Sequence, residues 1–465
     1  MKKYKYFPQN KDELKTLVNN KNIKLSNIDI SKVDDLSELF MENRRKNFSG
    51  IESWDVSHVK NMSNMFERAV YFNSDISGWN VSNVKNMYKM FFYAVNFNCN
   101  ISLWDTSKVE NMSEMFAWAE NFNQDLNNWN VSNVKNMAGM FFYAVNFNCN
   151  ISLWDTSKVE NMKEMFSGAK NFNQDLNKWN VSNVKNMSEM FCCASKFNGN
   201  ISLWDTSKVE NMRGMFEVAK NFNQDISLWD TSCVKDMSSM FYGAEVFNAD
   251  ITKWNTSSVE YMNFMFALTK NFNQNISKWD ISNVIAVTSM FNRAESFNQD
   301  LSCWDVYHMK SIAFMFFKAK NFNQDISSWK VSRECMTARI VSQSSVTNPP
   351  YWYCNKEYYN NQNEKTAGIK DKFVPLTNRE LIVVANNEDI SLNEIDVQYV
   401  SDFSNVFAYS EREDFSGIES WDVSHVKNMT DMFCSVDREH IPEWYDEDKW
   451  EDYETITKIE YKEED

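Results

Sequence analysis

The apolar residues of this chain fall at a helical spacing that returns every 25 residues. In the stretch from 79 to 104, positions i, i+3, i+6, i+7 and i+10 are occupied by Val84, Met87, Met90, Phe91 and Ala94. This spacing predicts one amphipathic α-helix of about three turns. Ser82 stands just before it, where its hydroxyl can accept from the N–H groups of a first helical turn.

A second apolar segment comes next, at a spacing that no longer suits a helix. A short strand around residues 100–102 would point Ile101 inward and its two polar neighbours outward. Stacked repeats would align these strands in a parallel sheet on one face, with the helices on the other. We therefore expect an α/β repeat fold with one short strand and one helix in each 25-residue coil.

Tryptophan marks the same position of every repeat. It keeps this period without insertion or deletion over 275 residues (329 − 54). The positions are Trp54, Trp79, Trp104, Trp129, Trp154, Trp179, Trp204, Trp229, Trp254, Trp279, Trp304 and Trp329. A fixed period of this length is typical of a solenoid, whose units stack on their neighbours and cannot fold alone. Function is then expected on the surface of the stack rather than in a deep cleft.

Asparagine comes directly after the second phenylalanine of every repeat. The positions are Asn73, Asn98, Asn123, Asn148, Asn173, Asn198, Asn223, Asn248, Asn273, Asn298 and Asn323. An amide carries both a donor and an acceptor, so we expect these side chains to bond to the backbone of neighbouring coils in a buried turn. The recurring Met and Phe residues are interpreted as core.

The repeat resembles a known family. Val84, Met87, Met90, Phe91, Ala94, Phe97, Asn98, Ile101 and Trp104 are similar to the 25-residue repeat of the BspA-like leucine-rich-repeat surface proteins, also known as a mycoplasma-type repeat of unknown function. The resemblance covers about residues 25–335 and again 390–434. It implies a right-handed leucine-rich-repeat-like solenoid, surface exposure and adhesion, and it supplies no catalytic residues.

The chain divides into five predicted regions. They are an N-terminal cap (1–53), a solenoid (54–335), an exit cap and linker (336–377), a second copy of the N-terminal cap (378–434) and an acidic tail (435–465). The second copy aligns with the first without a gap, and residues 48–62 are identical to residues 415–429. In the tail, Ile441, Trp444, Trp450 and Tyr453 are candidates to fold back over the open end of the second copy.

Charge and cysteine content bear on partners and compartment. The net charge of −16 argues against nucleic acid or an anionic membrane as partner. The N-terminus has basic residues without an apolar run after them, and no segment reaches transmembrane length, so we expect neither a signal peptide nor membrane insertion. The nine cysteines include the adjacent pair Cys192 and Cys193, which lacks CxxC spacing, and free thiols favour the cytoplasm. The family resemblance favours the cell surface, so localisation stays open.

The sequence offers no constellation for catalysis. The four histidines are His58, His308, His425 and His440, and none has a second ligand at metal spacing or a nucleophile beside it. Gly-rich phosphate loops, nucleophile elbows and EF-hand loops do not occur. We expect no enzyme activity, no catalytic residue, no cofactor and no metal.

One polar row stands out on the predicted strand face. It contains Asp75, Asn100, Asp125, Asn150, Asp175, Asn200, Asp225, Asp250, Asn275, Asp300 and Asp325, and is named the Asp/Asn row. Like charges about 4.8 Å apart repel by about 1 kcal/mol even in water, and alternation with Asn spreads that repulsion. Copying of a 50-residue double unit explains the alternation without function. The alternative is an acidic ridge for a basic or hydroxylated partner.

The sequence thus predicts a non-enzymatic repeat protein that binds macromolecules, most of all proteins of a host or of bacteria, over its strand face. Bacterial surface attachment or host interaction is the leading class, and an intracellular protein–protein scaffold is the alternative. The candidate partner-binding residues are Asp225, Asp250, Asp300 and Asp325, named the acidic row.

Overall fold

The structure is a computed structural model. It describes residues 4–347, 349–350, 353, 375, 378–386, 390–408, 410, 412–434, 436 and 440–446. The chain divides into two compact units, Met1–Tyr353 and Cys354–Asp465. The predicted linker and acidic tail lie mostly outside the described residues.

The helices whose bounds the structure describes lie in the two N-terminal caps. The first unit contains α1 (Lys11–Asn19), η1 (Leu25–Asn27) and η2 (Ile51–Ser53), and the second contains α3 (Asn378–Ala385), η3 (Leu392–Glu394) and η4 (Ile418–Ser420). Helix α1 begins because the side chain of Asn10 accepts a hydrogen bond from the backbone N–H of Glu13. Its buried residues Leu14 and Val18 cover the first coil of the stack.

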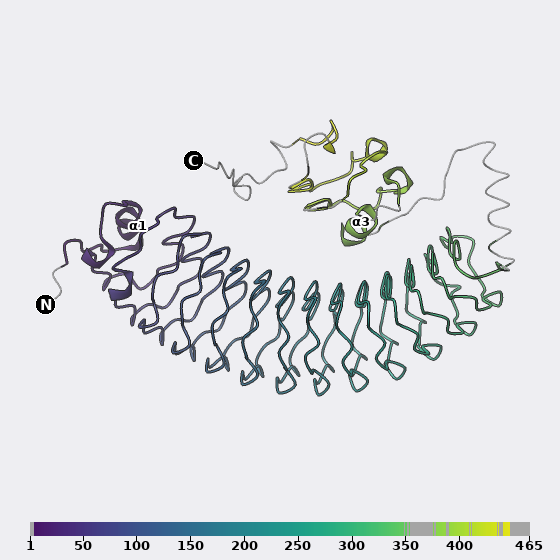
Figure 1. Ribbon diagram of the computed structural model, residues 1–465, viewed down its shortest axis with the longest axis horizontal. Helices are drawn as coiled ribbons and strands as arrows, with labels where there is room; N and C mark the ends of the chain where they lie inside the picture. The colour runs from purple at the N-terminus through teal and green to yellow at the C-terminus, as the bar shows by residue number, and fades with distance from the viewer. Residues whose placement is uncertain are drawn as a thin grey trace, which may run out of the picture. The chain divides into compact units, whose positions relative to one another are not determined.

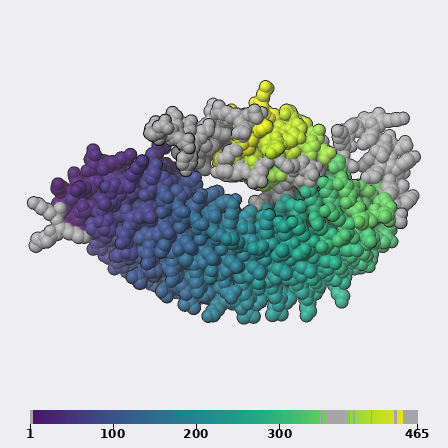
Figure 2. All heavy atoms as spheres, in the orientation of Figure 1, coloured from purple at the N-terminus to yellow at the C-terminus, as the bar shows by residue number. Residues whose placement is uncertain are grey.

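The rest of the first unit is a stack of 25-residue coils, drawn side by side in Figure 1. Alternate backbone amides donate to the next coil: Met87 N–H to Asn111 O at 3.0 Å, Lys89 to Ser113 at 3.1 Å, and Phe91 to Met115 at 2.9 Å. One-residue parallel bridges continue this bonding from Asp35 and Asn61 through to Met336. The space-filling view shows the coils in unbroken contact (Figure 2).

The predicted helix of each coil is wrong. Residues 88–93 form consecutive turns, closed by bonds such as Met90 N–H to Met87 O at 3.2 Å and Ala94 N–H to Phe91 O at 3.0 Å. Lys89 and Tyr93 have positive φ values of 52° and 54°, which no right-handed helix contains. In these turns alternate backbone N–H groups remain available to donate to the neighbouring coil. The backbone hydrogen bonds therefore run between coils instead of along a helix.

The predicted strand is also misplaced. Among the described residues, the inter-coil bridges of the stack lie at the Asn86 position, and residues 100–102 form none. Ile101 is buried and Asn100 exposed, as predicted, but Ser102 and Leu103 belong to a turn. The Asp/Asn row therefore lies at turns and not on a strand face.

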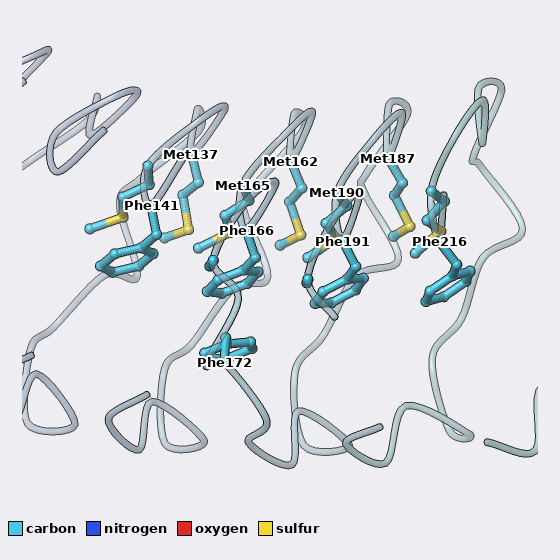
Figure 3. Packing of buried hydrophobic residues seen from close by; sticks show 14 of the residues in the cluster. Met137, Phe141, Met162, Met165, Phe166, Phe172, Met187, Met190, Phe191 and Phe216 are labelled. Atoms are coloured by element: carbon cyan, nitrogen blue, oxygen red, sulfur yellow. The ribbon is translucent and has the colours of Figure 1, made fainter. Parts of the chain in front are cut away.

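The apolar spacing nevertheless identified the core correctly. Val84, Met87, Met90, Phe91 and Ala94 are all 0% exposed. Figure 3 shows Phe141, Phe166, Phe191 and Phe216 pointing to the same side of successive coils. Ring centroids in this row are 5.6–5.7 Å apart from Phe66 to Phe316, nearly parallel throughout.

Two polar contacts per coil fix the 25-residue period. The repeat Trp indoles reach back to the preceding coil, as when Trp104 Nε1 donates to Ile76 O at 3.1 Å, and Trp304 is the exception because its buried Nε1 has no hydrogen-bond partner. The asparagine prediction is confirmed as a bonding pattern, since Asn98 N–H donates to Asn73 Oδ1 at 2.9 Å and Asn123 N–H to Asn98 Oδ1 at 3.0 Å. The predicted burial is wrong, because Asn73, Asn98 and Asn123 are exposed.

The stack continues beyond residue 335, where the sequence predicts an exit cap. Phe314 N–H donates to Ala338 O and Phe316 N–H to Ile340 O, both at 2.8 Å, so the first part of 336–377 forms one further coil. Tyr353 is buried in the same core, in keeping with an aromatic closure of the stack. An insertion anywhere in this array would break both the ring stacking and the inter-coil bonds.

Candidate binding surfaces

The acidic row consists of exposed carboxylates that close turns. Asp225 Oδ1 accepts from the Ser227 N–H at 2.9 Å, and Asp300 Oδ1 from the Ser302 N–H at 2.8 Å. Asp250 accepts from both the N–H and the hydroxyl of Thr252, at 2.9 and 2.7 Å. Asp325 accepts from the Ser327 N–H at 2.8 Å. These are Asx turns, in which a side-chain oxygen bonds to the backbone two residues ahead.

The negative charge is not needed for this turn. Asn100 Oδ1 makes the same bond to Ser102 at 3.0 Å, and Asn275 Oδ1 to Ser277 at 3.0 Å. The amide and the carboxylate share the acceptor oxygen that the turn requires. The fold therefore accounts for Asp or Asn at this position, and leaves the choice of Asp over Asn to something outside the turn.

The carboxylates of the acidic row are charged at neutral pH. Hydrogen bonds from the Ser227 side chain and backbone lower the pKa of Asp225, while the neighbouring Asp250 carboxylate opposes the shift. Bonds from the Ser302 backbone and side chain lower the pKa of Asp300, against the opposing charge of Asp325. The row is thus two repelling pairs, 225 with 250 and 300 with 325, separated by the neutral Asn275.

Exposed leucines occupy the same turns. Leu103, Leu153, Leu203 and Leu228, named the leucine row, are 85%, 61%, 68% and 76% exposed. Leu228 lies three residues after Asp225, so apolar and acidic side chains share one turn of the coil. Sequence reasoning missed this row, although leucine immediately before the repeat tryptophan was a visible signal. Apolar side chains aligned on a surface are typical of interaction sites.

A groove, named the lysine groove, lies on another part of the coils. Its volume is about 480 Å³, and its lining is Lys135, Lys158, Glu160, Asn183, Lys185 and Lys208. Lys158 Nζ donates to Asn133 Oδ1 and Lys208 Nζ to Asn183 Oδ1, each at 2.7 Å. These two lysines are held in place by amides of the preceding coil.

Three of the histidines, His58, His308 and His425, lie within hydrogen-bonding distance of backbone carbonyls. His58 Nε2 lies 3.2 Å from Ile30 O and 3.0 Å from Val33 O, and His425 Nε2 lies 3.1 Å from both Val397 O and Val400 O. In the described part of the chain, no group of three or more His, Cys, Asp or Glu side chains is placed to hold a metal ion. None of the cysteines there forms a disulfide: Cys99, Cys149, Cys192, Cys193, Cys233, Cys303, Cys335 and Cys434. No helix among these residues has the length and apolar character needed to span a bilayer.

The stacked coils, the inter-coil asparagine bonds and the repeated turns define a tandem-repeat protein. The chain belongs to the family described as Mycoplasma protein of unknown function, DUF285, which matches residues 10–127, 92–202, 173–267, 246–352 and 379–453. The matches cover both the stack and the second copy of the N-terminal cap. Neither the curated proteins nor the solved structures contain a match to this chain.

Proposed function

We propose that this chain is a non-enzymatic binding protein that holds a partner protein along the turns carrying the acidic and leucine rows. The observation that carries the proposal is the exposure of Leu203 and Leu228, at 68% and 76%, beside the carboxylates of Asp225 and Asp250. Leucines this exposed contribute little to the core, whereas on binding each removes apolar area from water. The carboxylates supply charge that the turn itself does not need.

The partner that fits is a protein with a basic and apolar strip. Each coil contributes one weak contact, and several coils acting together give useful affinity. Rim carboxylates raise the association rate and its salt sensitivity, while the leucines supply buried area. We propose a leucine-rich-repeat-like solenoid of the BspA-like class, acting at a bacterial surface in attachment or host interaction, as the setting for this binding.

An intracellular scaffold is the second candidate. It is favoured because the described cysteines form no disulfide with one another, whereas secreted proteins usually pair their cysteines. Protease treatment of intact source cells separates the two settings: a surface protein is digested while a cytoplasmic marker survives. Survival of this protein alongside the marker would exclude the surface setting.

Two sets of variants test the binding surface. Changing Asp225, Asp250, Asp300 and Asp325 together to Asn keeps every Asx acceptor and removes four charges. The binding assay uses the partner protein that is recovered from source cells by chemical cross-linking to this chain. We expect unchanged folding and at least about tenfold weaker binding of that partner, with the largest loss at low salt. Leu203→Ser with Leu228→Ser should weaken binding at every salt concentration.

A matched control lies in another coil. Asn128→Ser changes an exposed, uncharged residue that occupies the leucine-row position, and is expected to leave binding intact. If neither the acidic nor the leucine variant weakens binding, the partner does not use these turns.

A further inference from the structure

A row of alternating charge crosses eight consecutive coils. It consists of Lys85, Glu110, Lys135, Glu160, Lys185, Glu210, Lys235 and Glu260, and is named the Lys–Glu row. The first seven side chains are exposed and Glu260 is half-buried. The backbone fixes their register, since Glu110 N–H donates to Lys85 O at 2.9 Å and Lys135 N–H to Glu110 O at 3.0 Å.

The alternation is not a by-product of copying a two-coil unit. At the position four residues earlier, Val and Thr alternate from Val81 to Thr206, and then Thr231 and Thr256 end the alternation. In these same last two coils the Lys–Glu row continues with Lys235 and Glu260. Charge alternation therefore persists where the double unit has been lost, as selection for charge itself would produce.

Most of these charged side chains do not form ion pairs with their neighbours in the row. Among the described residues, the one ion pair within 4.0 Å inside the row is Lys235 with Glu210, at 3.9 Å. The lysine groove lies at the middle of the row, with Glu160 and Lys185 in its lining.

We propose that the Lys–Glu row binds a second copy of this chain, with the two stacks antiparallel. A two-fold axis in the contact plane, passing between the coils of Glu160 and Lys185, sets Glu160 opposite Lys185 of the second copy. It also sets Lys135 opposite Glu210, Glu110 opposite Lys235 and Lys85 opposite Glu260. By symmetry all eight positions face an opposite charge, as a self-complementary contact requires.

Two alternative arrangements of the copies are repelled by the same row. Parallel stacks in register put lysine on lysine, and a shift by one coil in the antiparallel arrangement does the same. The row two residues before the Lys–Glu row fits the same arrangement; it consists of Asn83, Lys108, Asn133, Lys158, Asn183 and Lys208. The axis sets Lys158 opposite Asn183, and no lysine of this row faces another lysine. The axis also sets Asp105 opposite Asp230, which repel each other. The eight attractive positions of the Lys–Glu row outnumber this repulsive contact.

The periodicity identifies the partner as a copy of this chain. A binding partner must present opposite charges that recur every two coils over eight coils. Another stack with the same coil spacing does so without adjustment. This surface is separate from the acidic and leucine rows, and the inference is independent of the function proposed for them.

Charge exchange tests the contact in the full chain. At about 20 mM salt, sedimentation velocity should show a dimer that dissociates at about 0.5 M, because screening weakens exposed charge pairs. Glu160→Lys alone and Lys185→Glu alone should each raise the dimer dissociation constant by at least about tenfold. The double exchange restores opposite charges across the axis and should return the constant to within about threefold of the parent.

A mixing experiment gives a second readout. One variant carries Lys at 110, 160, 210 and 260, and the other carries Glu at 85, 135, 185 and 235. Each should be monomeric alone, and the two should form a 1:1 complex when mixed. A parent that is monomeric at low salt, or a dimer that the single reversals leave unchanged, would overturn the proposal. Should either fourfold variant fail to fold, the single and double exchanges decide alone.

Discussion

Each of the two units contains a copy of the same cap, and the residues that cover the cap's outgoing face differ between them. Phe40 stacks on Phe66 at 5.4 Å in the first, and Phe407 on Phe433 at 5.3 Å in the second. Gly50 and Gly417 hold left-handed φ values of 99° and 94° at the same turn, where an added Cβ would meet backbone atoms at 2.5 and 2.7 Å. The cap therefore keeps its geometry whether a long stack or a short closure comes after it.

The difference lies in the residues that cover the outgoing face. In the first unit, Phe66 stacks on Phe91 of the next coil at 5.6 Å. In the second, Tyr445 packs edge-on against Phe433 at 4.9 Å, and its hydroxyl donates to Met429 O at 3.2 Å. A stack needs either another coil or an aromatic closure from outside the repeat, because an uncovered end exposes apolar rings and unpaired amides. Of the tail residues predicted to fold back over the second copy, Trp444 lies against Phe433 with ring centroids 6.4 Å apart, and Trp450 and Tyr453 lie outside the described residues. The closer contact comes from Tyr445, which the sequence does not predict.

The largest expected effect is a break in the middle of the first stack. Trp204 is 3% exposed and donates from Nε1 to Leu176 O at 2.9 Å. Trp204→Ala removes the ring and this bond, and should destabilise the first unit by about 3–5 kcal/mol. Thermal unfolding followed by circular dichroism should become broader or biphasic as the two halves separate.

The neighbouring residue supplies the control for that variant. Leu203 is 68% exposed, so Leu203→Ser should melt within about 1 kcal/mol of the parent although it lies one position away. A Trp204→Ala protein that melts like the parent would contradict the stacked core.

A smaller effect is expected at the closure of the second unit. Tyr445→Ala removes the ring from Phe433 and should destabilise that unit by about 2–4 kcal/mol, with the first unit's transition unchanged. Tyr445→Phe keeps the ring and loses the bond to Met429 O, at a cost of about 1 kcal/mol. Equal melting of the two variants would show that the ring does not close the stack.

The sequence predicted the residues of the core and missed the path of the backbone between them. Val84, Met87 and Phe91 fit a helical stripe because both a helix and a series of turns can direct these positions inward. Left-handed φ at Lys89 and Tyr93 is not expected from these residues, since non-glycine residues rarely adopt it. The signal that sequence reasoning missed is glycine at the same repeat positions in other coils, namely Gly139, Gly168, Gly214 and Gly243, all with positive φ. The turns are stable only because neighbouring coils accept the amides, and a single repeat carries no sign of that.

The candidate surfaces show the same limit. Exposure of the acidic row was predictable from its polar residues, and its Asx turns from Ser or Thr two positions later. In the sequence alone, the Lys85 position looks like a variable, solvent-exposed site. Its alternating charge becomes a surface only when the stack brings residues 25 apart in sequence side by side.

The smallest expected effect separates the two units by their response to acid. Hydrogen bonds in the Asx turns lower the pKa of Asp225, Asp250, Asp300 and Asp325 in the folded state. The unfolded chain returns them to about 3.9, so it binds more protons as pH falls through this range. The stabilisation is complete above about pH 4 and is lost as pH falls through the lowered folded values.

The fourfold Asp→Asn variant removes this titration and keeps the turns. Between pH 5 and 8 its melting temperature should differ from the parent by a constant amount, and below about pH 4 the parent's first unit should lose up to about 2 °C more than the variant's. The second unit carries the same turn at Asp414 and Asp422, which the variant leaves unchanged, so its transition should respond to acid identically in both proteins. A parent whose first unit gains stability relative to the variant below about pH 4 would mean that repulsion between neighbouring carboxylates outweighs their hydrogen bonds.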